Sequence, residues 1–217
     1  MDYQVKSKER VSDHGEVFTG DREVVAMLDL VQQETERIDS RFLEPACGTG
    51  NFLSEVLKRK LAIVEKRYKK SQTDYERYAV IAVSSIYGVD ILEDNVEECR
   101  DRLFDIFVQR YSRLFKTDGN KKCLETVRYI LSCNIIWGDA LTLKTVSDQP
   151  EYITFSEWSP IGNSQIKRRD YTFHGLLAHE SYRDTPLFSD LGEDVFIPSP
   201  ENEYPPVHFL EIAYVQK

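Results

Sequence analysis

One short stretch, Arg41-Phe-Leu-Glu-Pro-Ala-Cys-Gly-Thr-Gly-Asn-Phe-Leu53, constrains the fold of this chain more than any other part of its sequence. It begins with an apolar segment that reads as a buried strand and carries an acid, Glu44. Gly48 and Gly50 follow, and glycine lets the backbone take positive φ and pass close to a ligand. A helical pattern then begins at Asn51, a residue type that often caps helix N-termini. The stretch therefore predicts a strand, a ligand-binding loop and a helix in succession.

Helical and strand-like patterns alternate along the first two thirds of the chain. Apolar residues at helical spacing predict helices at about 21–38, from 51 to beyond 64, at 75–85, at 96–114 and at about 121–132. Short apolar runs predict strands at 42–46, 86–91 and 134–137. Strands that alternate with helices form parallel sheets through right-handed crossovers, so we predict an α/β fold with a mostly parallel sheet and helices on both faces. Ligands bind such sheets at the carboxyl ends of the strands.

The sequence changes character after about residue 144. A strand is expected at 152–158. From there to Pro206 the residues are typical of loops, because prolines, glycines and polar residues dominate. A last strand is expected at 207–215. The final third of the chain is therefore predicted to be irregular and to belong to the same domain.

The net charge of −9 at pH 7 bears on possible partners. A protein that grips nucleic acid on its own usually displays a basic surface, because phosphate contacts supply most of the non-specific affinity. Three local runs of the sequence are basic, and we interpret each as a solvated face or loop. They are Lys6–Arg10, Lys66–Lys70 with Tyr68 among them, and the segment Ile166-Lys-Arg-Arg-Asp-Tyr171.

Composition also argues against membrane and metal proteins. No apolar run approaches the roughly 18 residues of a membrane span, and the N-terminus lacks a signal-peptide pattern. The four cysteines show no Cys-x-x-Cys pairing, which argues against a zinc site or a disulfide framework. We expect a cytoplasmic protein with reduced thiols, no metal and no membrane association.

Two further acids fall at the ends of predicted strands. Asp90 lies in the strand 86–91, where its carboxylate could accept both hydrogen bonds of a ribose diol. Asp139 follows the strand 134–137, where it could accept a hydrogen bond from an adenine amino group. With Glu44, three acids stand at the ends of three successive strands, beside a loop suited to the charged amino-acid end of a ligand. This combination indicates S-adenosylmethionine.

A nicotinamide dinucleotide is the alternative ligand for a glycine loop of this kind. Its fingerprint is Gly-x-Gly-x-x-Gly with an acid about 20 residues further on. Leu53 stands in place of the third glycine, and the next strand-end acid, Asp90, comes about twice as far along as that fingerprint requires. Glu44 would also repel a pyrophosphate. The dinucleotide interpretation therefore fails.

The segment 42–52 resembles the cofactor loop of class I DNA adenine-N6 methyltransferases, especially the methylation subunits of restriction–modification systems. The upstream run His14-Gly-Glu-Val-Phe-Thr-Gly20 is similar to the segment that precedes that loop, where a Phe-Thr pair helps to enclose the methionine end of the cofactor. Thr19 has the alternative role of capping the following helix. The resemblance covers about residues 11–143.

The resemblance implies a Rossmann-like fold with S-adenosyl-L-methionine as cofactor, in one domain (1–217) made of a cofactor-binding part (1–143) and an irregular C-terminal part (144–217). DNA is the implied partner, reached through a separate specificity or restriction subunit. The implied cofactor-binding residues are Phe18, Thr19, Glu44, Pro45, Ala46, Gly48, Gly50, Asn51, Phe52, Asp90, Ile91, Asp139 and Ala140.

The chain departs from the family at the catalytic tetrad, Asn-Pro-Pro-Tyr or a close variant, which ends the fourth strand and holds the flipped target base. No such tetrad is present. About 20 residues after Asp139, where it should lie, stand the catalytic candidates Glu157, Trp158, Ser159 and Pro160. Glu157 is the carboxylate that could accept a hydrogen bond from the target amino group, and Trp158 is a candidate ring to stack on the base. Ser159-Pro160 resembles the start of the Ser-Pro-Pro-Tyr tetrad of cytosine-N4 enzymes, but Ile161 and Gly162 do not match its second half. Tyr204-Pro-Pro-Val207 has the prolines in the wrong order, much too late in the chain.

Two hypotheses follow. The chain is a DNA methyltransferase, adenine-N6 by resemblance, whose base pocket is unusual or completed by a partner subunit. Alternatively, it is a catalytically silent module that binds S-adenosylmethionine and serves as a regulatory or assembly subunit. A methyltransferase that acts on protein or a small molecule is a third, weaker option.

Overall fold

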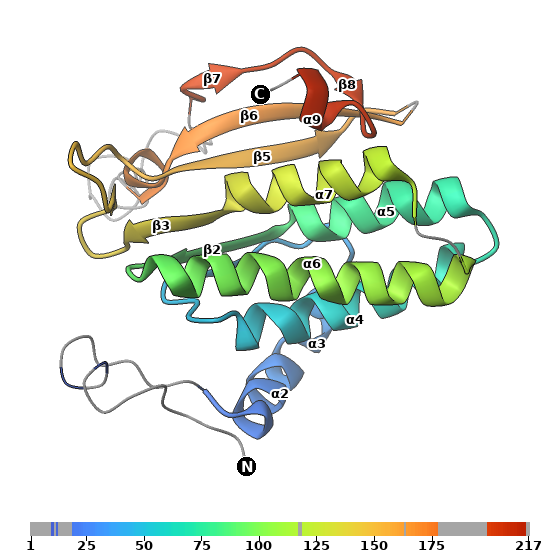
Figure 1. Cartoon of the computed structure of the whole chain (residues 1–217), viewed down its shortest axis with the longest axis horizontal. Helices are drawn as coiled ribbons and strands as arrows, with labels where there is room; N and C mark the ends of the chain where they lie inside the picture. Colours follow the sequence, from blue (N-terminus) through green and yellow to red (C-terminus); the bar gives the residue numbers. More distant parts are fainter. Residues whose placement is uncertain are drawn as a thin grey trace, which may run out of the picture.

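The structure is a computed structural model that describes residues 10, 12, 19–116, 119–162, 164–177 and 199–215. It has an α/β fold in which a mostly parallel sheet is flanked by helices (Figure 1). The sheet has the strand order β1-β2-β3-β4. Strands β1 (Phe42–Glu44), β2 (Ile86–Asp90) and β3 (Ile135–Asp139) are parallel, and β4 (Lys144–Thr145) pairs with β3 in the antiparallel sense. The predicted α/β class and mostly parallel sheet are confirmed.

The register of the sheet brings the carboxyl ends of the parallel strands to one edge. Glu44 lies opposite Gly88, and Asp90 lies opposite Trp137. Strand β2 therefore extends two residues beyond the end of β1, and β3 extends two residues beyond the end of β2. All five residues of β2 are buried, as expected for the central strand of a parallel sheet. Glu44, Asp90 and Asp139 are the last residues of their strands.

The helices agree with the predicted pattern in type and order. The long predicted helix at 21–38 is broken at Val31, whose backbone (φ −118°, ψ 31°) leaves the helical region. The last long helix extends to Asn134, so β3 begins one residue later than predicted. The helices that precede and surround the sheet are α2 (Asp21–Leu30), α3 (Gln32–Thr35), α4 (Asn51–Tyr68), α5 (Gln72–Ser84), α6 (Glu93–Phe115) and α7 (Lys121–Asn134).

The four long helices share one apolar core. Helix α4 contacts α5 and α6, and α7 contacts the same two helices. Leu57 and Leu61 on α4 and Phe107 on α6 are fully buried, and burial of such side chains is worth about 1.5–3 kcal/mol each. Helices α5 and α7 lead almost directly into β2 and β3, so helix packing also fixes where these strands begin (Figure 1).

A second sheet covers part of the face for which helices were predicted. Ile153, Phe155 and Phe173 pack against Tyr87 and Val89 of β2. The strands of this sheet are β5 (Thr154–Pro160), β6 (Gln165–Thr172), β7 (Asn202–Glu203) and β8 (Val207–His208). Figure 1 shows that β5 runs in the opposite direction to β3.

Two predictions for the C-terminal third are wrong. The segment from 159 to 206, predicted to be loop-like, contains the eight-residue strand β6, which pairs with β5 along its whole length. The predicted strand at 207–215 is a two-residue strand, β8, followed by the short helix α9 (Ile212–Val215).

Strand β6 has a buried face made partly of charged residues. Ile166 and Asp170 are buried, and the Arg168 side chain is 11% exposed. These positions alternate along the strand as a half-buried strand requires. Charged residues hide that alternation in the sequence, because arginine and aspartate are rarely buried unless they are paired.

None of the helices in the described ranges combines the length and the apolar composition that crossing a membrane would require.

Candidate functional site at the carboxyl ends of the parallel strands

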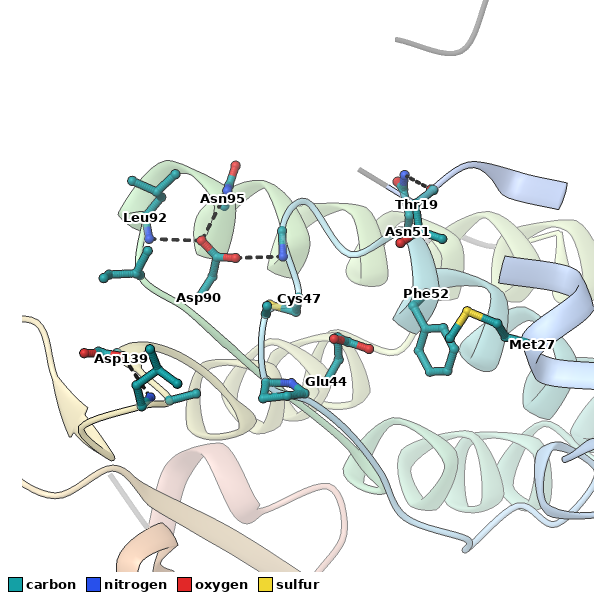
Figure 2. A pocket seen from close by; sticks show the side chains of 17 residues that line it. Thr19, Met27, Glu44, Cys47, Asn51, Phe52, Asp90, Leu92, Asn95 and Asp139 are labelled. Atoms are coloured by element: carbon teal, nitrogen blue, oxygen red, sulfur yellow. Dashed lines mark hydrogen bonds between the residues drawn. The ribbon is translucent and has the colours of Figure 1, made fainter. Parts of the chain in front are cut away.

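The ends of β1, β2 and β3 open into a cavity of about 620 Å³ (Figure 2). This volume is within the range of small-molecule and cofactor sites. The cavity is lined by Thr19, Met27, Glu44, Pro45, Ala46, Cys47, Gly48, Asn51, Phe52, Asp90, Ile91, Leu92, Asn95, Gly138, Asp139, Ala140 and Leu141.

Asp90 ties the glycine loop to the end of β2. Its Oδ2 accepts a hydrogen bond from the Gly48 N–H at 2.8 Å. Its Oδ1 accepts one from the Leu92 N–H at 3.0 Å and one from the Asn95 side-chain amide at 3.2 Å (Figure 2). The residue is 8% exposed. The carboxylate therefore positions the loop that forms one wall of the cavity.

These bonds limit what else Asp90 can accept. A carboxylate offers about four lone-pair positions, and three of them are used here. One position on Oδ2 remains for a ligand hydroxyl. For both hydroxyls of a ribose to bind, a ligand hydroxyl would have to replace one of the three present donors.

Of the three strand-end acids in the cavity, Glu44 accepts the fewest hydrogen bonds from residues that the structure describes. Burial raises the pKa of its carboxyl above the ordinary value of 4.5, and a hydrogen bond from the Ala46 backbone opposes this shift in part. No ion pair involves Glu44 within the described part of the chain. A cationic group in the cavity would relieve the desolvation of this carboxylate.

The two glycines of the loop have different roles. Gly48 and Gly50 both have positive φ, at +51° and +84°. Gly48 lines the cavity, but Gly50 does not. A Cβ atom on Gly50 would lie 2.6 Å from the Cys99 sulfur on α6, so close packing of the loop against α6 requires this glycine. Gly50 thus has a packing role, and its predicted approach to a ligand stays a prediction.

Asp139 lies at the other side of the cavity, at the end of β3. Its Oδ1 accepts from the Leu141 N–H at 2.8 Å, and its Oδ2 accepts from the Thr142 hydroxyl at 3.0 Å. Two exposed apolar side chains stand nearby in the lining, Ile91 at 47% and Leu141 at 95% exposure. The site thus combines a partly satisfied carboxylate with apolar surface that a flat ring could cover.

Neither predicted helix cap is observed. Gly50, and not Asn51, is the N-cap of α4, and Gly20, and not Thr19, is the N-cap of α2. Instead, the Asn51 side-chain amide donates to the Thr19 carbonyl at 3.2 Å, which joins the start of α4 to the segment before α2 (Figure 2). Arg102 donates to the other end of the same amide.

Eleven of the predicted cofactor-binding residues line the cavity together. They are Thr19, Glu44, Pro45, Ala46, Gly48, Asn51, Phe52, Asp90, Ile91, Asp139 and Ala140. Gly50 is buried and does not line the cavity. Phe18 lies outside the described residues.

Sequence reasoning missed the remaining lining residues. Asn95 gives a usable signal, because it is a polar residue five positions after Asp90 and directly before the predicted helix at 96–114. In the structure it lies in the first turn of α6, is almost completely buried and donates to Asp90. Gly138 directly precedes Asp139, which is its signal in the sequence, and its packing 2.7 Å from the Ile153 side chain, measured to a Cβ placed on it, is visible in the structure alone. The others missed were Met27, Cys47, Leu92 and Leu141, which give no signal beyond proximity to the motifs.

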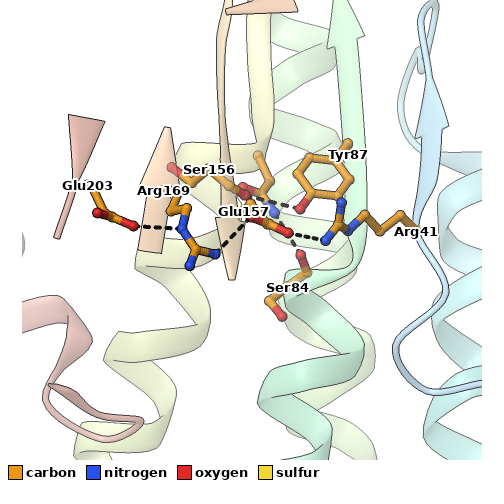
Figure 3. Close-up of polar contacts among 8 residues, drawn as sticks. Arg41, Ser84, Tyr87, Ser156, Glu157, Arg169 and Glu203 are labelled. Atoms are coloured by element: carbon orange, nitrogen blue, oxygen red, sulfur yellow. Dashed lines mark hydrogen bonds and ion pairs between the residues drawn. The ribbon is translucent and has the colours of Figure 1, made fainter. Parts of the chain in front are cut away.

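Glu157, the predicted amine acceptor, belongs to a network of ion pairs on the second sheet (Figure 3). Arg41 donates to one of its oxygens, and Arg169 lies 3.4 Å from the other. Arg169 also contacts Glu203 at 2.8 Å. Glu157 does not line the cavity at the strand ends.

The other three catalytic candidates also lie away from that cavity. Trp158 is 6% exposed and its indole N–H donates to the Asn134 side chain at 3.2 Å, at the point where β3 is about to begin. Ser159 and Pro160 end β5, which runs away from the cavity (Figure 1). The arrangement does not bring Glu157, Trp158, Ser159 or Pro160 to the place where the cofactor residues gather.

A smaller cavity of about 350 Å³ lies beside Glu157. Its lining is largely aromatic and aliphatic, with the Arg41–Glu157 pair as its charged part. The residues are Arg41, Leu43, Tyr87, Phe155, Glu157, Tyr171 and Leu176.

Within the described residues, no group of His, Cys, Asp and Glu side chains could hold a metal ion. Comparison with known proteins found no family model, no curated protein and no solved structure that matches this chain.

Proposed function

We propose that this chain binds S-adenosyl-L-methionine in the cavity at the strand ends. The observation that carries the proposal is the convergence of three strand-end carboxylates, Glu44, Asp90 and Asp139, with the glycine loop on one cavity of cofactor size. Sequence patterns some 95 residues apart named these acids independently of one another. The parallel sheet brings the three strand ends to one edge, and the support for a cofactor comes from the acid that each strand end carries and from the glycine loop beside them.

The chemistry of the donors and acceptors fits the proposed cofactor. Glu44 is a desolvated carboxylate suited to an ammonium group. Asp90 keeps one acceptor position for a ribose hydroxyl. Asp139 with the apolar Ile91 and Leu141 suits an adenine ring and its amino group. When bound, this cofactor supplies an electrophilic methyl group, and the residues of this chain hold and orient it.

We further propose that the fold is Rossmann-like and that the chain is a restriction–modification-related DNA methyltransferase of the adenine-N6 class, working in the cytoplasm. The similarity of the loop at 42–52 and of the Phe18-Thr19 segment to that family supports the choice. A partner subunit supplies target recognition, because the chain is acidic overall.

A specific observation favours a second candidate function. Trp158 is buried in the core and Glu157 is bridged by two arginines, so neither offers a base-binding group at the cofactor cavity. A catalytically silent module that binds S-adenosylmethionine and serves as a regulatory or assembly subunit accommodates this observation.

Calorimetric titration of the purified chain with S-adenosylmethionine tests what the two functions share. We expect saturable binding at one site per chain, and an absence of binding would overturn both. Transfer of a radiolabelled methyl group to plasmid DNA then separates them. Transfer by the chain, alone or together with proteins encoded beside it, supports the methyltransferase. Cofactor binding without transfer in either case supports the silent module.

A further inference from the structure

The three basic runs of this acidic chain differ in what their side chains contact. Within Lys6–Arg10 the structure describes only Arg10, which pairs with Asp94 at 2.6 Å. In the run at 166–171, Lys167 and Arg169 pair with Glu203, and Arg168 pairs with Asp170. The charges of this run are therefore neutralised within the second sheet.

The run Lys66–Lys70 is different. It lies at the end of α4 and just beyond it, and its four cations Lys66, Arg67, Lys69 and Lys70 are all exposed. Arg77 on the neighbouring helix α5 is partly exposed. In the described part of the chain, none of these five side chains forms an ion pair. We call these five residues, with Tyr68 and Tyr78, the α4-end patch.

Two tyrosines join the cations of the patch. The rings of Tyr68 and Tyr78 are stacked, with centroids 3.9 Å apart and an interplanar angle of 5°. The Arg77 guanidinium lies 5.5 Å from the centroid of Tyr78. Both tyrosines are partly exposed, so the patch combines positive charge with aromatic surface.

Helix electrostatics accounts for only part of the patch. Cations in the last turn of a helix are favoured by its dipole, and this explains Lys66 and Arg67 on α4. Lys69 and Lys70 lie beyond the helix end, where the effect has fallen away. Arg77 is in the first half of α5, where no such benefit exists. Asp74 lies near Tyr68, and Glu65 pairs with Arg110 and Arg113, but neither forms an ion pair with the five cations in the described ranges. An anionic partner would therefore stabilise these like charges.

We propose that the α4-end patch binds the phosphate backbone of DNA. Phosphates spaced along a strand can engage several cations at once, and bases or sugars can lie against tyrosine rings. An acidic protein would use the cations but would gain less from the stacked tyrosines. The inference rests on the proposed function only in taking DNA as the nucleic acid.

The position of the patch fits DNA that also reaches the cofactor cavity. Helix α4 starts at the glycine loop and ends at the patch (Figure 1). Its 18 residues span about 27 Å at 1.5 Å per residue. That length corresponds to about eight base pairs of duplex. One duplex could therefore lie along the molecule from the cavity to the patch.

The test is fluorescence anisotropy with a labelled duplex and its separate strands, at low salt and in a salt series. The patch variant carries Lys66→Gln, Arg67→Gln, Lys69→Gln and Lys70→Gln, which changes the net charge from −9 to −13 by removing four positive charges. The control variant removes the same number of charges from exposed, ion-paired residues elsewhere, through Arg37→Gln, Lys58→Gln, Lys121→Gln and Arg128→Gln.

We expect the patch variant to lose at least tenfold in duplex affinity and the control variant less than threefold. The slope of log affinity against log salt concentration should fall by about 3 to 4 for the patch variant, since each phosphate contact contributes about 0.9. Circular dichroism and thermal unfolding establish that both variants are folded. The exposed positions make loss of folding an unexpected result.

Three outcomes would overturn the inference. The first is that the unmodified chain binds neither duplex nor single strands at low salt. The second is that both variants lose the same factor in duplex affinity. The third is that the unmodified chain binds poly-glutamate as tightly as duplex, which would identify an acidic protein as the partner. Calorimetry with S-adenosylmethionine on the same samples keeps the two proposals separate. If the patch variant still binds the cofactor but no longer binds the duplex, the result supports both the cofactor site and the DNA-binding patch. If the unmodified chain binds the duplex but not the cofactor, the result supports the patch and contradicts the proposed function.

Discussion

The carboxylates at the ends of the parallel strands differ from those of the second sheet in what contacts them. Asp90 and Asp139 accept hydrogen bonds from backbone N–H groups, an amide and a hydroxyl, and they face a cavity. Glu157 and Asp170 are bridged to arginines. The same residue type therefore serves two purposes. Where no cation among the described residues neutralises an acid beside a cavity, we infer that the acid is available to a ligand. Where arginines neutralise an acid, the pair stabilises the fold.

The largest effect should come from Asp170→Ala. The Asp170 carboxylate accepts two hydrogen bonds from Arg168, at 2.7 and 2.9 Å, and further bonds from Ser156 and Tyr204. Removing one member of a buried, hydrogen-bonded ion pair costs about 3–5 kcal/mol. We expect the free energy of unfolding, measured by urea titration, to fall by about that amount.

A matched control is Asp148→Ala, an exposed acid on the same C-terminal side of the chain, which should change stability by less than about 0.5 kcal/mol. The affinity of the folded Asp170→Ala protein for S-adenosylmethionine should stay within twofold of the original. If the folded Asp170→Ala protein also lost cofactor affinity, the result would contradict the distinction between ligand-binding acids at the strand ends and structural acids on the second sheet.

The second-largest effect, on cofactor affinity, is expected for Asp90→Ala. This change removes the acceptor proposed for the cofactor ribose and releases the N–H groups of Gly48 and Leu92 that shape the cavity. We expect the dissociation constant for S-adenosylmethionine to rise at least tenfold, about 1.4 kcal/mol, in a calorimetric titration. Asp105→Ala removes an exposed acid from α6 and is the control. Equal affinities for the two variants would exclude Asp90 from the site.

The sequence predicted the site at the ends of the parallel strands much better than it predicted the second sheet. Glycines, strand-end acids and apolar periodicity are local signals, and they identified β1, β2, β3 and most of the cavity lining. In β6 the buried face includes Arg168 and Asp170, whose burial is compensated by their ion pair and by hydrogen bonds with Tyr129, Ser156 and Tyr204. A pairing of this kind depends on the fold around it, so the alternation of the strand could not be recognised from residue types.

Details of the cavity escaped prediction for a related reason. Gly48 and Gly50 were both predicted to pass close to a ligand, and Gly48 lines the cavity whereas Gly50 does not. The constraint on Gly50 that the motif does not reveal is the Cys99 sulfur on α6, almost 50 residues away in the sequence. Trp158 was considered as a ring that stacks on a base, but it is buried against Asn134. That position depends on the direction in which β5 runs, which no local sequence pattern specifies. Tertiary contacts decided both cases.

A smaller effect should come from Glu44, and it should depend on pH. Burial raises the pKa of this carboxyl above 4.5 in the ligand-free protein, and a bound ammonium group would lower it. Affinity for S-adenosylmethionine is therefore full above the raised pKa and is lost as the pH falls through it, beginning at a higher pH than for an ordinary glutamate. Glu44→Gln should weaken binding about threefold to tenfold at neutral pH and flatten this dependence. An unchanged pH profile in the variant would assign the ammonium contact to another group.

The smallest effect is expected for Glu157→Gln. Arg41 is 62% exposed on its side chain and can be hydrated, and Arg169 keeps its contact with Glu203, so the loss of this charge leaves no buried cation isolated. Surface ion pairs are worth about 0–1 kcal/mol, and we expect a change of that size in the free energy of unfolding by urea titration. Affinity for S-adenosylmethionine should be unaltered, because Glu157 does not line the cofactor cavity. If the assembled system transfers methyl groups to DNA, the variant should retain that activity. A loss of transfer with intact folding and cofactor binding would restore Glu157 as a catalytic residue and move the second sheet from a structural role to a chemical one.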